Sequence, residues 1–334
     1  MSDWMPSEAE RRRIFEESIL PIVFPEVPKP NAPTLLLLGG QSGAGKSRAT
    51  SRLLSEHSSD MVPLSGDDLR PFHPQFLELA RSRSVEAPQI LAESTAGWLR
   101  DCLVHARTTG RSLLLEGTFH TPDVALGTAE LFEQHGFTTR VVVVATPRAE
   151  SLLAAASRYL LDAQAGRASR FTSLAIHDSG WYGTRELVAE LEESPSVGRL
   201  TVIARDGSAA FDAERDAGFE GAGAALDRER SVSMSGAESM RWLSELRAMT
   251  AFALSAGKVE RPVAELLTEL HEVALNEVVP RLQLPAGSEA RPATEAALAG
   301  QLATLRRAAS LDLEPVDLAA PVIAVPQSGR GISR

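Results

Sequence analysis

The chain has 334 residues, a formal net charge of −10 and 43% apolar residues, which is ordinary for a folded protein in water. The acidic balance argues against a broad nucleic-acid surface, which would need a basic excess, and no stretch approaches the roughly 20 apolar residues of a membrane helix. Cys102 is the only cysteine, so no intrachain disulfide can form, which fits a reducing compartment. The first 18 residues have no signal-type apolar core. We therefore expect a cytoplasmic protein that binds neither nucleic acid nor membrane.

The elements expected along the chain alternate between strand and helix. An amphipathic helix is predicted over 7–24, and the proline-rich segment 25–33 cannot be helical throughout. Strands are then predicted at 35–38, 61–64, 112–115, 140–145 and 200–204, and helices at 46–56, 87–109, 123–135, 148–165 and 184–193. Continuous apolar strands separated by helices predict an α/β fold with a parallel sheet and helices on both faces. Active sites of such sheets lie beyond the carboxyl ends of the strands.

The alternation stops near residue 206. Helices are predicted again at 235–256, 262–284 and 292–309, and they could form an accessory domain, a lid or an inhibitory segment. We therefore predict five regions: an N-terminal helix and connector packing on the core over 1–33, the core over 34–206, a linker over 207–225, a helical accessory region over 226–312 and a loose tail over 313–334.

A phosphate-binding loop follows the first predicted strand. Residues 39–47, Gly-Gly-Gln-Ser-Gly-Ala-Gly-Lys-Ser, match G-x-x-x-x-G-K-[ST] between a strand and a helix, as the motif requires. Its glycines let backbone N–H groups converge on phosphate oxygens at a helix N-terminus. Lys46, one of only three lysines among 34 basic residues, would reach the β- and γ-phosphates of ATP, and the Ser47 hydroxyl would hold Mg²⁺. The expected ATP-binding residues are Gly40, Gln41, Ser42, Gly43, Ala44, Gly45, Lys46 and Ser47.

Two acidic residues follow other strands at the same edge of the sheet. Asp67 comes just after the second predicted strand and is a candidate base for the proton of an alcohol acceptor; alternatively it caps a helix. Its neighbour Asp68 is more typical of a cap, and His73, before a proline, of a loop anchor. Glu116 ends the third strand, where it could bind a substrate hydroxyl, organise metal and water, or simply accept backbone N–H groups.

Further polar residues follow on loops and helices. His120, Thr121 and Thr128 are near enough in sequence to Glu116 to line a substrate pocket. Arg158, on a predicted helix, and Arg167 or Arg170, on the loop after it, could neutralise charge on a transferring phosphoryl group. The alternative for each is an ordinary surface arginine, since arginine is common in this chain.

In combination these motifs resemble the zeta toxin family of bacterial toxin–antitoxin systems. The matching segments cover roughly residues 10–206: the loop 39–47, the block D-D-L-R-x-x-H-P at 67–74, E-G-T at 116–118 with a downstream threonine, Arg158-Tyr159, the arginines of 166–171, and His177-Asp178. The resemblance implies a P-loop kinase fold for this part, and the C-terminal helical segment predicted after residue 225 lies outside it. It also implies ATP-dependent phosphorylation of a sugar hydroxyl of UDP-N-acetylglucosamine or a related nucleotide sugar, which blocks cell-wall precursor synthesis.

The resemblance also implies roles for individual residues. Lys46 and Ser47 would bind ATP and Mg²⁺, Asp67 would be the catalytic base, and Arg158 with a second arginine, for which we favour Arg170 over Arg167, would grip the phosphates. The expected substrate contacts are Asp67, Glu116, Thr118 and Thr128, with His120 at a position that is often basic in the family, and with Glu93 as a candidate acid on the preceding helix. A small helical epsilon-type antitoxin would cover the ATP site, unless the C-terminal helices act as an internal inhibitor.

Two other functions remain open from the sequence. One is a kinase of the same fold that acts on another metabolite, such as a dinucleotide, a nucleoside or an antibiotic hydroxyl. The other is a binding module in which ATP occupancy changes how the C-terminal helices dock on a partner.

Overall fold

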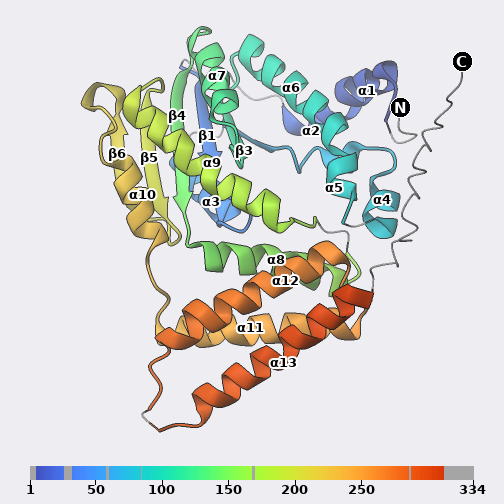
Figure 1. Ribbon diagram of the computed structural model, residues 1–334. Coiled ribbons are helices and arrows are strands. Elements are labelled where there is room, and N and C mark those ends of the chain that lie inside the picture. The colour runs from blue at the N-terminus through green and yellow to red at the C-terminus, as the bar shows by residue number, and fades with distance from the viewer. Residues whose placement is uncertain are drawn as a thin grey trace, which may run out of the picture.

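The computed structural model of the protein describes residues 5–25, 32–57, 60–83, 85–167, 170–285 and 287–311. Its centre is a six-stranded sheet with the strand order β2-β3-β1-β4-β5-β6 (Figure 1). The strands are β1 (Thr34–Gly39), β2 (Val62–Ser65), β3 (Leu113–Gly117), β4 (Thr138–Ala145), β5 (Arg199–Ala204) and β6 (Ala209–Glu214). The first five are parallel to one another, and β6 is antiparallel to β5. The predicted α/β fold with a parallel sheet is confirmed.

Helices cover both faces of this sheet, because its central strands are apolar on both sides. Leu36 and Leu38 of β1 belong to an apolar layer with Ala49 and Leu53 of α3 (Lys46–Glu56). The alternate residues of β1 belong to the opposite layer, which is covered by α6 (Ala92–Thr109), α7 (Pro122–Glu133), α9 (Leu174–Glu193) and α10 (Ala222–Arg230). The alternation of side chains along a strand thus feeds two separate cores.

The N-terminal segment lies against α6. It consists of α1 (Glu8–Ile14), a π-helical turn over Phe15–Ile19 and α2 (Leu20–Val23). The indole N–H of Trp98 donates to the backbone oxygen of Arg11 at 3.0 Å, and Ile19 is buried in the larger of the two sheet cores. Most of the proline-rich connector, residues 26–31, lies outside the described residues.

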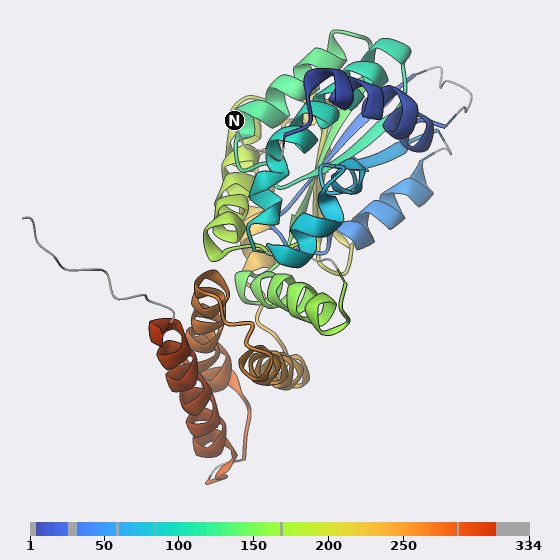
Figure 2. The same cartoon turned by 90° about the vertical axis from the view of Figure 1, so that its right-hand side faces the viewer.

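Helix α8 (Arg148–Gln164) lies between the sheet and a C-terminal bundle (Figures 1 and 2). This C-terminal bundle consists of α11 (Gly236–Ser255), α12 (Arg261–Val273) and α13 (Ala290–Leu311). A π-helical turn over Ala274–Val278 and a 3₁₀ turn over Val279–Arg281 continue α12. One apolar cluster joins the bundle to α8; among its buried members are Leu152, Leu160, Leu246, Leu267 and Leu305.

Several predicted boundaries are wrong. The segment 207–225, expected to be a linker, contains β6, so the sheet extends past the predicted core boundary at 206, and α10 begins at Ala222. The helix expected at 184–193 starts ten residues earlier, where the Ser173 hydroxyl accepts from the Ile176 N–H and caps α9. The helix expected at 87–109 is broken at Leu91 into α5 (Ala87–Ile90) and α6, and α4 (Phe76–Ser82) precedes them. The tail 313–334 lies outside the described residues.

Over the part of the chain that the structure describes, no helix combines the length and the apolar character that crossing a bilayer requires.

Candidate active site

The phosphate-binding loop connects β1 to α3 and lies directly against α8. Gly43 has φ +78° and Gly45 has φ +96°, which is the left-handed region that glycine adopts without strain. A Cβ on Gly43 would lie 2.0 Å from the backbone oxygen of Ser151 on α8. The glycine at this position is therefore required both by its backbone conformation and by the close approach of α8.

Lys46 begins α3 and turns back over the loop. Its ammonium donates to the backbone oxygens of Gly40 at 2.8 Å and Gln41 at 3.0 Å. The pKa of Lys46 is lowered to about 8, chiefly by burial; the charge of Glu116 opposes this shift, and the charges of Arg170 and Arg158 add to it. An anionic ligand bound here would stabilise the charged form of Lys46, which is buried among other cations.

Asp67 lies in the turn that follows β2. The carboxylate of its neighbour Asp68 accepts from the backbone N–H and the hydroxyl of Ser65, both at 2.8 Å, and so fixes this turn. The carboxylate of Asp68 thus bonds back to Ser65 within the turn and does not cap a following helix. Asp67 is left to face two guanidinium groups, with Oδ2 2.5 Å from Nη1 of Arg170 and Oδ1 3.2 Å from Nη2 of Arg70.

The charge state of Asp67 follows from these partners. Burial raises the pKa of its carboxyl group, but the charges of Arg170 and Arg70 outweigh burial and hold the pKa below its ordinary value. Asp67 is therefore a carboxylate at neutral pH. An anion that drew Arg170 away from it would raise its affinity for a proton.

Glu116 is the second carboxylate at this edge. It lies at the end of β3, next to β1 in the sheet, and its Oε2 accepts from the Thr50 hydroxyl of α3 at 3.3 Å. Just beyond it, Phe119 has φ +43°, a left-handed conformation that is rare for a bulky residue. Its ring would lie 2.8 Å from a Cβ on Gly39 or Gly117, so these two glycines make room for it. Backbone conformations of this kind are concentrated at functional sites.

Two arginines approach the loop from the side of α8. Nη2 of Arg158 donates to the hydroxyl of Ser42 in the phosphate loop at 3.1 Å. Arg170, from the segment before α9, meets Asp67 as described above. Arg167 instead pairs with Asp162, and its side chain is 65% exposed. The structure thus brings Arg170, and not Arg167, to the site.

These groups line a cavity of about 500 Å³, here called the phosphate cavity. Of the predicted site residues, the structure brings to it Ser42, Gly43, Ala44, Gly45, Lys46, Ser47, Asp67, Glu116, Thr118, Arg158 and Arg170. A smaller hollow of about 220 Å³ shares Asp67 and Arg170 with it and continues between Phe76 and Leu91.

Three predicted substrate contacts lie apart from this cavity. Thr128 donates to the backbone oxygen of Val124 within α7 at 2.6 Å, and Glu93 is exposed on α6. His120 is exposed, and its Nδ1 lies 3.2 Å from the Thr118 hydroxyl, so it reaches the cavity only through Thr118. The helical positions of Thr128 and Glu93 direct them elsewhere, which the spacing in sequence does not reveal.

Two residues of the predicted loop, Gly40 and Gln41, do not line the cavity and instead support the loop. Gly40 offers its carbonyl to Lys46. The side chain of Gln41 is buried and donates to the backbone oxygen of Thr146 and to the hydroxyl of Ser151, both at 3.0 Å. These contacts hold the loop to β4 and α8 rather than bind a ligand.

Arg70 is a residue that the sequence analysis missed. It lines the cavity and pairs with Asp67 from three positions further along the chain. A spacing of i, i+3 after a turn was the signal that could have indicated it. Within the described chain, Nε of Arg70 and Nε of Arg170 are buried without a hydrogen-bond partner. Buried donors without a partner need a ligand or water, and anionic oxygens would supply acceptors for both.

His177 and Asp178 lie near the start of α9. Nδ1 of His177 lies 3.0 Å from Asp178 and Nε2 lies 2.9 Å from the hydroxyl of Ser151. Arg148 holds Asp178 with two hydrogen bonds of 2.8 and 2.9 Å and contacts Glu269 of α12 at 2.6 Å. A continuous polar chain, the Gln41–Glu269 network, therefore runs from the phosphate loop to the C-terminal bundle.

This geometry is suited to one kind of chemistry. Backbone N–H groups at the start of α3, one ammonium and four guanidinium groups surround a space in which several phosphate charges would be neutralised. Two carboxylates at the carboxyl ends of β2 and β3 line the same space. A hydroxyl placed between the carboxylates and a bound phosphate could lose its proton to Asp67 while it attacks phosphorus.

The chain is also similar in sequence to known proteins. The model of the family described as Zeta toxin matches residues 23–216, which is more than half of the chain. Toxin PezT of Streptococcus pneumoniae is 28% identical over 188 residues, covering 55% of this chain and 73% of PezT. Toxin zeta of Enterococcus hirae is 28% identical over 148 residues, covering 44% of this chain and 52% of that toxin.

A solved structure shares the fold. The structure described as belonging to the PezAT chromosomal toxin–antitoxin system of Streptococcus pneumoniae has a TM-score of 0.64 and 23% sequence identity, and the match covers 74% of this chain and 98% of that chain.

Proposed function

The chain belongs to the zeta toxin family, and from that premise we propose that it is an ATP-dependent phosphotransferase that phosphorylates a sugar hydroxyl of UDP-N-acetylglucosamine or a related nucleotide sugar. The observation that carries the proposal is the phosphate cavity. In it, Asp67 and Glu116 lie in the same space as Lys46 and the phosphate loop.

The proposed reaction is a direct transfer. The acceptor hydroxyl oxygen bonds to the γ-phosphorus of ATP, the bond from that phosphorus to the leaving oxygen of ADP breaks, and the hydroxyl proton goes to Asp67. Lys46, Arg158 and Arg170 stabilise the charge on the transferring group. Because Arg170 is paired with Asp67 at 2.5 Å, a bound triphosphate would compete for this arginine and free the carboxylate to accept the proton.

The donor set also fits Mg²⁺. The Ser47 side chain is exposed at the start of α3 and lines the cavity together with Glu116. Mg²⁺ is usually held by one or two protein oxygens, phosphate oxygens and water rather than by a cage of side chains. Bound there, the ion would neutralise phosphate charge, and Ser47 and Glu116 are the residues that would hold it or its waters.

The shape of the site fits an acceptor larger than a simple alcohol. The hollow between Phe76 and Leu91 continues the phosphate cavity on the far side of Asp67. It has apolar walls that would accommodate part of a bulky acceptor, such as a base or an acyl-amino sugar. Thr118 and Glu116 offer hydrogen-bonding groups for its hydroxyls.

Regulation by an antitoxin is part of the proposal. The related structure is described as a toxin–antitoxin system, and we propose that a small antitoxin protein restrains this chain by covering the nucleotide site. The internal-inhibitor alternative would need the C-terminal bundle to block the phosphate cavity. All residues that line this cavity fall within 42–205, so the described part of the bundle leaves it open.

A panel of acceptors tests the proposal. The full chain is incubated with γ-labelled ATP, Mg²⁺ and UDP-N-acetylglucosamine, other nucleotide sugars, dinucleotides, nucleosides or an aminoglycoside, and the products are identified. We expect label on the sugar of a nucleotide sugar. Label only on another acceptor would replace the substrate assignment, and hydrolysis or no turnover with every acceptor would favour an ATP-switched binding module.

A further inference from the structure

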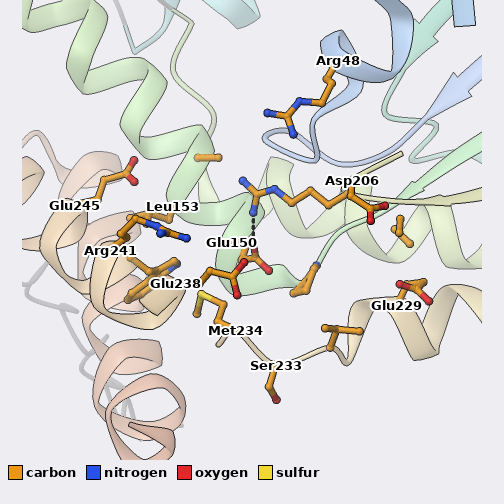
Figure 3. Close-up of a pocket in the computed structure, with 17 residues that line it drawn as sticks. Arg48, Glu150, Leu153, Asp206, Glu229, Ser233, Met234, Glu238, Arg241 and Glu245 are labelled. Carbon is orange, nitrogen blue, oxygen red and sulfur yellow. Dashed lines mark hydrogen bonds and ion pairs between the residues drawn. The ribbon is translucent and has the colours of Figure 1, made fainter. Parts of the chain in front are cut away.

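A second cavity lies beside the phosphate cavity. Its volume is about 600 Å³, within the usual range for small-molecule sites. It is formed between the carboxyl ends of β4 and β5, the start of α3, one face of α8 and helix α11 of the C-terminal bundle (Figure 3). We call it the α11 cavity.

The two cavities adjoin each other and share two lining residues. Ala154 of α8 and Arg205, just after β5, line both of them. Arg48, which lines the α11 cavity, is the residue after Ser47 of the loop. A ligand held by its phosphates at the loop can therefore extend past Ala154 and Arg205 into the α11 cavity without leaving the protein.

The direction of a bound nucleotide follows from the positions of the charges. The side of the loop toward Asp67 and Glu116 is where the acceptor must lie if Asp67 takes its proton. The γ-phosphate must point to that side, so the ribose and base of the donor must extend the other way. The α11 cavity opens on that other side of the loop, next to Arg48.

The walls of the α11 cavity suit a nucleobase. Leu153, Met234 and Trp242 give it apolar surface, and the indole N–H of Trp242 donates to the backbone oxygen of Ala149 at 3.0 Å, which fixes that ring. Arg205 and Glu150, which both line the cavity, form an ion pair. The rest of the lining is largely charged and includes five carboxylates, from Glu150, Asp206, Glu229, Glu238 and Glu245. A base has two apolar faces, which the apolar side chains can contact, and a polar edge, whose N–H groups can donate to carboxylates.

Arg241 is the residue of α11 most suited to contact a ligand. It reaches into the cavity from α11, while Arg48 approaches from α3 on the opposite side (Figure 3). In the described chain neither Arg241 nor Arg48 forms a side-chain hydrogen bond or ion pair, whereas Arg205, the third arginine of the cavity, pairs with Glu150. A guanidinium can stack on a base or donate to its ring nitrogens and carbonyls.

We propose that the α11 cavity receives the base of the donor nucleotide, and that Arg241 on α11 is a specificity-determining residue for this base. The inference rests on the proposed function, since it takes a nucleoside triphosphate as the donor. Helix α11 begins beyond the residues 23–216 that match the family. The C-terminal bundle of this chain would thus complete the nucleotide site rather than inhibit it.

Binding measurements on the full chain test this inference. The dissociation constants of ATP and of inorganic tripolyphosphate are compared for wild type, Arg241→Ala and the control Arg247→Ala, an exposed arginine on α11 that lines neither cavity. We expect Arg241→Ala to weaken ATP about fivefold, the effect of one lost polar contact, and to leave tripolyphosphate unchanged. Arg247→Ala should change neither.

The outcomes separate the two proposals. Binding of neither ligand by wild type would overturn the proposed function and this inference with it. Normal ATP binding by Arg241→Ala would overturn only the inference. Equal weakening of both ligands would also overturn it, because Arg241 would then act on the phosphates and not on the base.

Photolabelling gives an independent readout that does not depend on a substitution. The full chain is irradiated with 8-azido-ATP, with and without excess ATP, and the modified peptides are identified. We expect ATP-protected labelling of a peptide from residues 232–245. Protected labelling confined to peptides from α6 or α7 would place the base on the acceptor side and contradict the inference.

Discussion

The sheet region and the C-terminal bundle are built from similar apolar side chains but differ in where their polar groups lie. In the sheet region, five parallel strands end at one edge and bring Lys46, Asp67 and Glu116 from separate parts of the chain into one cavity. In the C-terminal bundle, α11, α12 and α13 bury a shared apolar core and leave their charges on the outside. The strand ends therefore bring reactive polar side chains together, whereas the bundle core mainly stabilises the fold and supports the lining of a cavity.

Helix α8 belongs to both regions. Ser151 and Arg158 face the phosphate loop, while Leu152, Tyr159 and Leu160 lie in the core of the bundle. Because these two faces are on one rigid helix, a change in the bundle can reach the phosphate loop without any direct contact. Substitutions in each region can show whether the sheet region and the C-terminal bundle unfold and bind ATP independently of each other.

The largest effect is expected from Lys46→Ala in the sheet region. It removes the ammonium nearest to the transferring phosphate, and we expect phosphoryl transfer to fall by about 100- to 1000-fold. Lys258→Ala, which changes a lysine of the loop between α11 and α12, is the control and should leave transfer unchanged. Steady-state transfer from labelled ATP measures both, and a loss of less than tenfold for Lys46→Ala would contradict the role of the loop.

A core substitution in the bundle tests whether it folds with the sheet region. Leu267 is fully buried, so Leu267→Ala should lower the free energy of unfolding by about 2–5 kcal/mol. Glu265→Ala, on the exposed side of α12, should change it by less than about 0.5 kcal/mol. If α8 couples the regions, denaturant unfolding followed by far-ultraviolet circular dichroism shows one shifted transition. Two transitions, with only one of them shifted, would show that the bundle unfolds independently.

Nucleotide affinity should depend on pH through Lys46. Its pKa is lowered to about 8 in the free protein, chiefly by burial, and a bound triphosphate would raise it by favouring the ammonium form. Affinity for ATP should therefore be constant below pH 8 and fall up to about tenfold per pH unit above it. Titrations between pH 7 and 10 measure this, and the guanidinium of Lys46→Arg should abolish the fall. A flat profile for wild type would contradict the assignment.

The smallest effect is expected from Glu269→Gln at the bundle end of the Gln41–Glu269 network. Arg148 keeps its two hydrogen bonds to Asp178, so stability should fall by less than about 1 kcal/mol. Asp178→Asn, which disturbs the centre of the network, should cost more. Thermal unfolding and ATP titration of both variants measure stability and affinity. Equal losses of stability in the two variants would contradict this, because Glu269 would then contribute as much as Asp178.

The two regions also differ in what could be predicted from the sequence. All five parallel strands were predicted to within about three residues at either end, because continuous apolar runs between helices have few other interpretations. The phosphate loop, Asp67 and Glu116 were predicted because each directly follows a strand. The antiparallel β6 was missed, since its exposed and half-buried residues Ala209–Glu214 lack the apolar run that indicates a buried strand.

Other parts of the site depend on tertiary contacts that spacing does not encode. Thr128 is four residues beyond Val124 on α7, and its hydroxyl bonds to its own helix instead of facing the cavity. Arg167 and Arg170 are three residues apart in the sequence. The family resemblance favours Arg170, but only the fold shows that Arg167 pairs with Asp162 and Arg170 with Asp67. The α11 cavity was not predictable, because it requires the packing of α11 against α8.

The central claim is that the carboxylate of Asp67 accepts the proton of an alcohol that attacks a triphosphate held at Lys46. The most direct test is Asp67→Asn, measured for ATP affinity and for transfer to the acceptor that wild type uses. For Asp67→Asn we expect an ATP dissociation constant within about threefold of wild type and a transfer rate lowered at least about 100-fold. Near-normal transfer by Asp67→Asn, with ATP still bound, would contradict it.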